Sequence, residues 1–214
     1  MPEQTAYRTL AATGMDRFTE QRSEFIGYAS PCQTEAQALA FLEKIRSKHA
    51  DAKHCVYAYI LRENHISRFS DDREPSGTAG LPTLNILRRG EITDACVAVV
   101  RYFGGILLGT GGLTRAYTKG AQIAVEAAGI VLRRLHRTFT VNLGYSDYQK
   151  VLSLFVRFSV QTVQTSYTDR VKIYGAVPVE MQAAFAAALA DITCGAANLS
   201  LGEERFETVW AKAE

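Results

Sequence analysis

The chain has 214 residues, 47% of them hydrophobic, which is enough to bury a core in one or two domains. Its 24 Lys and Arg residues nearly balance its 22 Asp and Glu residues, so the overall charge demands neither nucleic acid nor an anionic membrane as partner. No apolar run approaches the roughly 20 residues of a membrane-spanning helix, and residues 1–10 lack the regions of a secretory signal. We therefore expect a cytoplasmic protein with no membrane partner, whose basic surface, if any, is local.

The first half of the chain mixes strands with one clear helix. A strand is expected around Phe25 to Ala29, followed by an amphipathic helix from Thr34 to His49 with Thr34 as its N-cap. Further strands are predicted at Cys55 to Leu61 and at Ile66 to Ser70, where β-branched and aromatic residues gather.

Turn formers crowd the next segment, DDREPSGTAGLP, which covers residues 71–82 and predicts a constrained loop. Ser76 or Thr78 is expected to cap a short helix that runs through Leu87. A continuous apolar run then predicts a strand at Ala95 to Val100, buried on both faces because it has no polar face to present to water.

Five glycines follow that strand within the loop FGGILLGTGG, residues 103–112. A helix is expected to start near Gly112 or Leu113, with Arg115 and Lys119 on its solvent face. Each cation near a helix N-terminus costs a few tenths to about 1 kcal/mol at an exposed site, and a bound phosphate or carboxylate would offset this cost. Arg101, at the end of the strand, would add a bidentate contact to such an anion.

A second interpretation gives the loop a purely structural role. The glycines then serve tight turns and close packing, and Arg101 pairs with Asp71, Asp72 or Glu74. Neither a Walker A ending nor a clean dinucleotide fingerprint is present. Tyr102 and Phe103 follow Arg101. They offer a stacking surface for bases in the first interpretation and are core side chains in the second.

The second half has cleaner periodicities. The predicted order of elements is βαββαβ. It consists of a strand from Phe139 to Tyr145, a helix over Tyr148 to Phe155, two strands at Val160–Tyr167 and Val171–Val179, an alanine-rich helix through Ala190 and a last strand near Asn198. This order predicts a ferredoxin-like sandwich, an antiparallel sheet with two helices on one face. The whole chain is therefore predicted to be an α+β protein of two domains, an N-terminal α/β domain over residues 1–136 and a C-terminal ferredoxin-like domain over residues 137–214.

Two segments of the first half, SDDREPSGTAGLPTLNIL (70–87) and VAVVRYFGGILLGTGGLTRAY (97–117), resemble the paired signatures of the IMPACT family. The resemblance implies an N-terminal domain similar to domain IV of elongation factor G and a C-terminal domain similar to its domain V, and both likenesses point toward RNA and the ribosome. One residue departs from the pattern, because Arg73 stands where the family commonly has glycine. By matched position the motif residues are Asp71, Asp72, Glu74, Pro75, Ser76, Gly77, Thr78, Gly80, Arg101, Gly104, Gly105, Gly109, Gly111, Gly112 and Tyr117.

We favour a non-catalytic protein that binds RNA or the ribosome, or a translation factor, and regulates translation, with no cofactor, no catalytic residue and no DNA specificity. One alternative is an enzyme that acts on a nucleotide or phosphorylated small molecule, with Mg²⁺ held by Asp71, Asp72 and Glu74. Another is a protein-interaction module that regulates a translation factor. The residues expected to contact nucleic acid or another anion are Arg101, Tyr102, Gly104, Gly105, Gly109, Gly111, Gly112, Arg115, Lys119, Ser76 and Thr78.

Overall fold

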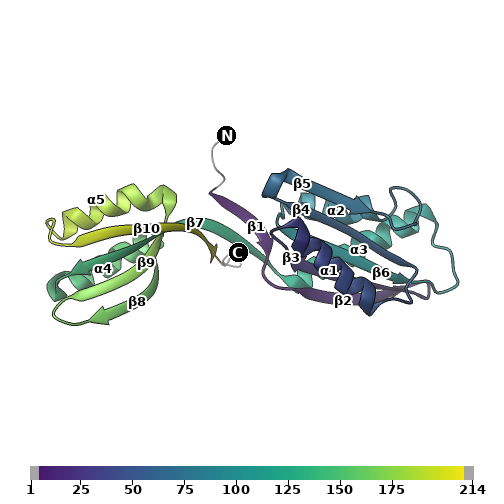
Figure 1. The fold of residues 1–214 in the computed structure, drawn as a ribbon, viewed down its shortest axis with the longest axis horizontal. Helices are drawn as coiled ribbons and strands as arrows, with labels where there is room; N and C mark the ends of the chain where they lie inside the picture. The colour runs from purple at the N-terminus through teal and green to yellow at the C-terminus, as the bar shows by residue number, and fades with distance from the viewer. Residues whose placement is uncertain (1–4, 210–214) are drawn as a thin grey trace. The chain divides into compact units, whose positions relative to one another are not determined.

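The protein, seen in a computed structural model that describes residues 5–209, is an α+β chain that divides into two compact units (Figure 1). Residues 7–132 form the N-terminal unit, and residues 133–209 with residues 5 and 6 form the C-terminal unit. Both units contain a largely antiparallel sheet. No helix in residues 5–209 is both long and apolar enough to cross a membrane.

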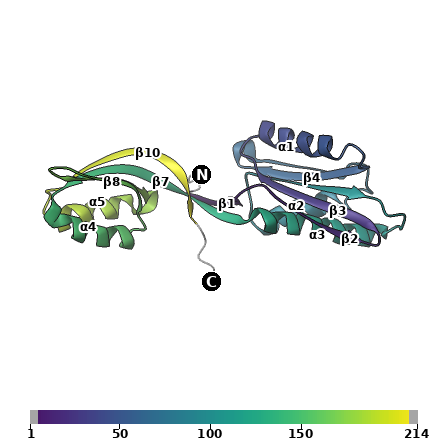
Figure 2. The ribbon, with the colours of Figure 1, turned by 90° about the horizontal axis from the view of Figure 1, so that it is seen from below.

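The N-terminal unit is built on a five-stranded antiparallel sheet with the order β2-β3-β6-β4-β5. Its strands are β2 (Gly14–Glu20), β3 (Ser23–Pro31), β4 (His54–Leu61), β5 (Ile66–Ser70) and β6 (Ala95–Tyr102). Strand β1 (Ala6–Leu10) precedes them and belongs to the second sheet. Helix α1 (Glu35–Lys48) covers one face of the sheet, whereas α2 (Gly80–Arg89) and α3 (Gly109–Ala128) cover the other (Figure 2). A short 3₁₀ helix, η1 (Glu63–His65), links β4 to β5.

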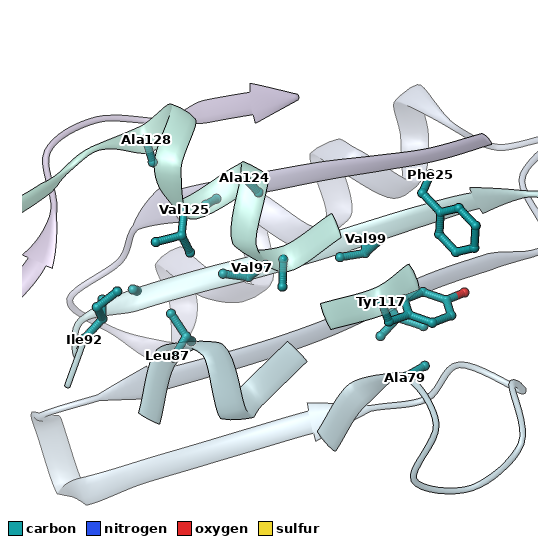
Figure 3. Packing of buried hydrophobic residues seen from close by; sticks show 14 of the residues in the cluster. Phe25, Ala79, Leu87, Ile92, Val97, Val99, Tyr117, Ala124, Val125 and Ala128 are labelled. Atoms are coloured by element: carbon teal, nitrogen blue, oxygen red, sulfur yellow. The ribbon is translucent and has the colours of Figure 1, made fainter. Parts of the chain in front are cut away.

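The central strand β6 is buried on both faces, as its apolar run predicts. Its odd-numbered residues Val97 and Val99 pack with α3, and the even-numbered Ala98 and Val100 join the cluster under α1 (Figure 3). Helix α3 lies unusually close to the sheet, since a Cβ at Gly27 would stand 2.1 Å from the Gly120 carbonyl oxygen. This close approach fixes the position of the middle of α3 on the sheet.

The expected helix after Thr34 is confirmed, and its cap is the predicted one. The backbone N–H of Gln37 donates to Thr34 Oγ1 at 3.3 Å. The strands expected near Phe25, Cys55 and Ile66 also lie in the predicted places. The prediction missed β1 and β2, and it began α3 too late, because the helix starts at Gly109.

The C-terminal unit follows the predicted order of elements. It contains β7 (Ile130–Leu143), α4 (Tyr145–Arg157), β8 (Gln161–Tyr167), β9 (Val171–Pro178), the 3₁₀ helix η2 (Val179–Met181), α5 (Gln182–Ile192) and β10 (Asn198–Val209). The sheet has five strands, because both β1 and β10 pair with β7, and its β10-β7-β9-β8 part has the order of a split βαβ sandwich. Both helices pack on one face of it, where Phe155 and Phe185 meet Phe139 of β7.

Candidate functional site

The acidic end of the turn-rich loop holds the N-terminus of α2. Asp71 Oδ1 accepts hydrogen bonds from the N–H groups of Ala79 (3.0 Å) and Gly80 (2.7 Å), and its Oδ2 accepts one from Gly77 (2.9 Å). The predicted caps are wrong: the residue before α2 is Ala79, and Thr78 Oγ1 donates to the Pro75 carbonyl at 2.7 Å. The Asp71 carboxylate occupies the position that a bound anion would take at the N-terminus of α2. No further anion can therefore bind there.

A buried ion pair lies behind the glycine-rich loop. Arg101 Nη1 donates to Glu74 Oε1 at 2.7 Å, with the two residues only 5% and 8% exposed. The Tyr117 hydroxyl donates to the same oxygen at 2.7 Å, and His54 Nε2 lies 3.9 Å from it. Of the three acidic partners left open by the sequence, Glu74 is the one that Arg101 uses.

The side chains around this pair are themselves buried. Burial holds the pKa of the Tyr117 phenol well above its ordinary value, and the charge of Glu74 and the hydrogen bond to it act in the same direction. The hydroxyl therefore remains a donor. Tyr117 also packs edge-on against Phe25, with ring centroids 5.3 Å apart (Figure 3). The carboxylate of Glu74 is thus fixed by two donors and cannot turn away from Arg101.

Arg101 retains donors that the protein does not use. Its Nε is buried and has no hydrogen-bond partner among residues 5–209. The guanidinium lines a cavity of about 430 Å³ together with Lys53, His54 and Glu74. A buried donor without a partner is uncommon in folded proteins, although Arg133 and Arg137 also have such an Nε in this chain.

The first turn of α3 faces the same cavity. Gly109 and Thr110 line it, and no side chain caps this N-terminus within the described residues. The rest of the wall is apolar and comes mainly from the loop, with Phe103, Leu107 and Leu108. The cavity therefore combines an open helix start, a buried cation and a flat ring.

The loop glycines have separate roles. Gly104 lies against the β2–β3 turn, where a Cβ would stand 2.0 Å from the Arg22 carbonyl oxygen, while Gly105 and Gly109 have φ of 84° and 66°. By contrast, Gly111 and Gly112 lie inside α3, where no such backbone demand exists. The structural interpretation accounts for the first three glycines and for Gly112, where a Cβ would stand 3.0 Å from Leu108 Cβ, and it leaves Gly111 unexplained.

Alanine at Gly104 and at Gly111 should shift stability in opposite directions. At Gly104 the loop must move, and we expect the free energy of unfolding to fall by about 1–3 kcal/mol. At Gly111 the nearest atom to a Cβ is Arg115 Nη1 at 3.6 Å, so the better helix former should add about 0.5–1 kcal/mol. Urea unfolding of both variants measures this difference, and a Gly111→Ala protein less stable than the parent would contradict it.

Arg115 and Lys119 lie on the outer face of α3, as predicted. Both are exposed, and with Phe18 and Gly112 they line a second hollow of about 180 Å³. Lys119 Nζ stands 4.4 Å from the centre of the Phe18 ring. Leu108 lines both hollows, so the two hollows flank the first turn of α3.

Tyr102 lies apart from both hollows. Because side chains alternate along β6, it joins the cluster under α1, where its hydroxyl bonds to His49 Nδ1 and donates to Asp51 Oδ1, both at 2.9 Å. Burial and then Asp51 raise the pKa of Tyr102 to about 12, and burial with Lys48 lowers the pKa of His49. The ring beside the cavity is that of Phe103.

Two regions of the chain match known domain families. Residues 21–125 match the Impact N-terminal domain, and residues 141–196 match a domain of unknown function, DUF1949. "IMPACT family member YvyE" of Bacillus subtilis is 34% identical over 199 residues, 92% of each chain. "IMPACT family member YigZ" of Escherichia coli is 33% identical over 187 residues, 86% of this chain and 92% of its own.

This chain belongs to the IMPACT family. A solved structure described as that of a hypothetical protein has the same fold, with a TM-score of 0.60 and 30% identity over 92% of this chain and 97% of its own. Protein IMPACT-A of Xenopus tropicalis is 33% identical over 98 residues, 44% of this chain and 31% of its own.

Arg73, the residue that departs from the expected motif, has a backbone conformation that favours glycine. It has φ of 69°, next to Asp72 at 41°, so both lie in the left-handed region. Its side chain is 80% exposed and donates to the Lys53 carbonyl at 3.4 Å. The conformation persists at a cost of about 1–2 kcal/mol for a residue with a Cβ.

The acidic cluster of this IMPACT-family chain is used by the protein itself. Asp71 binds the start of α2, Asp72 Oδ2 accepts from the Cys55 N–H at 2.6 Å, and Glu74 binds Arg101. Within residues 5–209, no group of three or more His, Cys, Asp or Glu residues is arranged to hold a metal ion.

Sequence reasoning did not assign Lys53, His54 or Leu107 to the site. Antiparallel pairing of β4 with β6 sets His54 opposite Arg101, and this register is not visible in the sequence. Leu107 did leave a signal, because an apolar side chain in a glycine-rich loop is unusual, and it is 85% exposed. Ser76 and Thr78 line neither of the two hollows at α3.

Proposed function

We propose that this IMPACT-family protein is a non-catalytic RNA-binding protein that associates with the ribosome and regulates translation. RNA phosphates would lie along the N-terminal turns of α3, against the exposed side chains of Arg115 and Lys119. The observation that carries the proposal is the uncapped start of a 20-residue helix, with two cations on the outer face of its second and third turns. The expected likeness of the N-terminal unit to domain IV of elongation factor G is part of this proposal.

The electrostatics of α3 support an anionic partner. The peptide dipoles of a helix place about half a positive charge at its N-terminus, which attracts an anion. Arg115 and Lys119 lie one turn apart on the same face of α3, in its second and third turns, and add two cations next to this end. Arg115 and Lys119 have no carboxylate partner among the described residues, and the helix has no acidic residue in its first turn. A row of phosphates would neutralise the dipole and both side chains together.

The glycines of the first turn fit the same partner. Gly111 is exposed and has open space around its Cα, so a phosphate can approach the backbone N–H groups more closely than it could past a Cβ. Retaining glycine at a helical position lowers stability without a structural reason, which is a pattern expected at a binding surface.

Removing the two cations should weaken RNA binding and its dependence on salt. For Arg115→Ala/Lys119→Ala we expect affinity for a single-stranded RNA to fall by about one to two orders of magnitude, and the slope of log K against log salt to fall by about 1–2. Fluorescence anisotropy at low and moderate salt measures both. Arg101 is left intact, since its loss would disturb the buried pair.

The matched control is Lys44→Ala/Lys48→Ala, which removes the same charge from α1 on the opposite face of the sheet. It should keep most of the affinity. Equal losses in the two double variants would mean that overall charge attracts the RNA, and the absence of binding by the parent protein would refute the proposal.

A further inference from the structure

The cavity beside α3 restricts the size and charge of a ligand more than an exposed basic surface does. It is walled on one side by buried charged groups and on the other by the loop, and its volume of about 430 Å³ lies within the range of small-molecule sites. We propose that this cavity binds one nucleotide unit by its phosphate monoester, supplied by the phosphorylated end of an RNA strand or by a free mononucleotide. For the first source the inference rests on the proposed function; for the second it stands alone.

Arg101 is a prepared donor in this cavity. Its guanidinium is held by Glu74 at 2.7 Å, and its Cζ stands 5.6 Å and 5.4 Å from the ring centres of Phe25 and Phe103. Only Nη1 donates a hydrogen bond within the described residues, while Nε is buried without a partner. Glu74 takes one of the five guanidinium N–H donors, so a phosphate oxygen in the cavity would accept from the remaining donors of a group whose orientation is already set.

The remaining polar groups favour an anion. The charge of Glu74 is matched by Arg101, which leaves Lys53 and the open start of α3, at Gly109 and Thr110, as the unmatched positive groups. A phosphate monoester carries close to two negative charges at neutral pH, whereas a phosphodiester inside a strand carries one. The terminal phosphate is therefore the form that suits this cavity.

The apolar wall favours a ring next to that phosphate. Phe103 is 46% exposed and Leu107 is 85% exposed, and both line the cavity with Pro75 and Leu113. Aromatic and apolar side chains provide stacking for a base of any identity. The space suits one nucleotide and excludes a base-paired segment, so the proposal is restricted to a strand end or a free nucleotide.

The test compares ligands that differ only in their phosphate. Calorimetry would use one short RNA with a 5′-phosphate, with a 3′-phosphate and with hydroxyls at both ends, followed by AMP and adenosine. We expect a preference of at least about tenfold for one phosphorylated end, for AMP over adenosine, or for both. An end preference identifies the strand as the source, and binding of AMP without an end preference identifies the free nucleotide.

Variants assign the preference to the cavity. Lys53 is exposed, so Lys53→Ala keeps the fold, and it should reduce the phosphate preference to less than about threefold; Lys44→Ala, on α1, should leave it unchanged. Arg101→Lys, which keeps a cation beside Glu74 but loses the fork of donors, should have the same effect as Lys53→Ala.

Failure of this inference is distinguishable from failure of the proposed function. If RNA binds equally with and without a terminal phosphate and AMP does not bind, the cavity proposal is overturned while RNA binding by α3 stands. If no RNA binds but AMP binds and Lys53→Ala abolishes it, the cavity site stands and the RNA proposal fails. A preference that survives both Lys53→Ala and Arg101→Lys also overturns the cavity proposal.

Discussion

Replacing Arg101 with alanine should lower the free energy of unfolding by about 3–5 kcal/mol. The side chain of Glu74 is 4% exposed and would remain buried without a cation, since Tyr117 supplies only a neutral donor. Breaking a buried pair on one side costs far more than an exposed pair contributes. Urea unfolding at neutral pH, followed by circular dichroism, measures the loss.

A double variant separates the charge effect from lost packing. In Arg101→Ala/Glu74→Gln the carboxylate is gone, while the amide oxygen still accepts from Tyr117. We expect the double variant to be more stable than Arg101→Ala alone, so that the two substitutions are strongly non-additive. A cost below about 1 kcal/mol for the single variant, or simple additivity, would show that water reaches the pair.

The parts of the fold that the sequence predicts are those that local patterns determine. The apolar run of β6 has no polar face, so its double burial follows from composition alone, and Thr34 stands where an N-cap is needed. The order βαββαβ follows in the same way from alternating and helical periodicities.

Local sequence patterns do not determine the start of α3 or the cap of α2. Glycine is a poor helix former, so residues 109–112 predict a loop, yet α3 begins at Gly109 and packs closely on the sheet farther along, where Gly120 meets Gly27. Asp71 caps a helix that begins nine residues later, outside the spacing at which caps are sought. Tertiary contacts decide both features.

The residues of the predicted anion site do not all lie together. Gly109 and Arg101 line the larger cavity, whereas Gly112, Arg115 and Lys119 line the smaller hollow. Because side chains alternate along β6, Tyr102 lies on the opposite face of the sheet. The sequence supplies the residue types, but only the pairing of β4 with β6 and the path of the loop decide which of them meet.

Asp71→Ala is expected to cost about 2–4 kcal/mol, the second largest effect. The carboxylate satisfies the N–H groups of Gly77, Ala79 and Gly80, and hydrogen bonds to a charged group contribute more than neutral ones. Ala79 is fully buried, so water cannot replace the lost acceptor at its N–H. Urea unfolding measures the cost, and hydrogen exchange should show α2 opening before α1.

Asp71→Asn is the matched control, because it keeps one oxygen acceptor but turns the other into a donor that faces the Gly77 N–H. It should retain part of the stability lost in Asp71→Ala. The start of α2 lacks any other side-chain cap in the described residues, and Thr78 is already bonded to Pro75, so no neighbour can take over. Equal stability of Asp71→Ala and the parent would mean that the turn is held by its own backbone, and α2 would then be free to bind an anion at its N-terminus as α3 does in the proposed function.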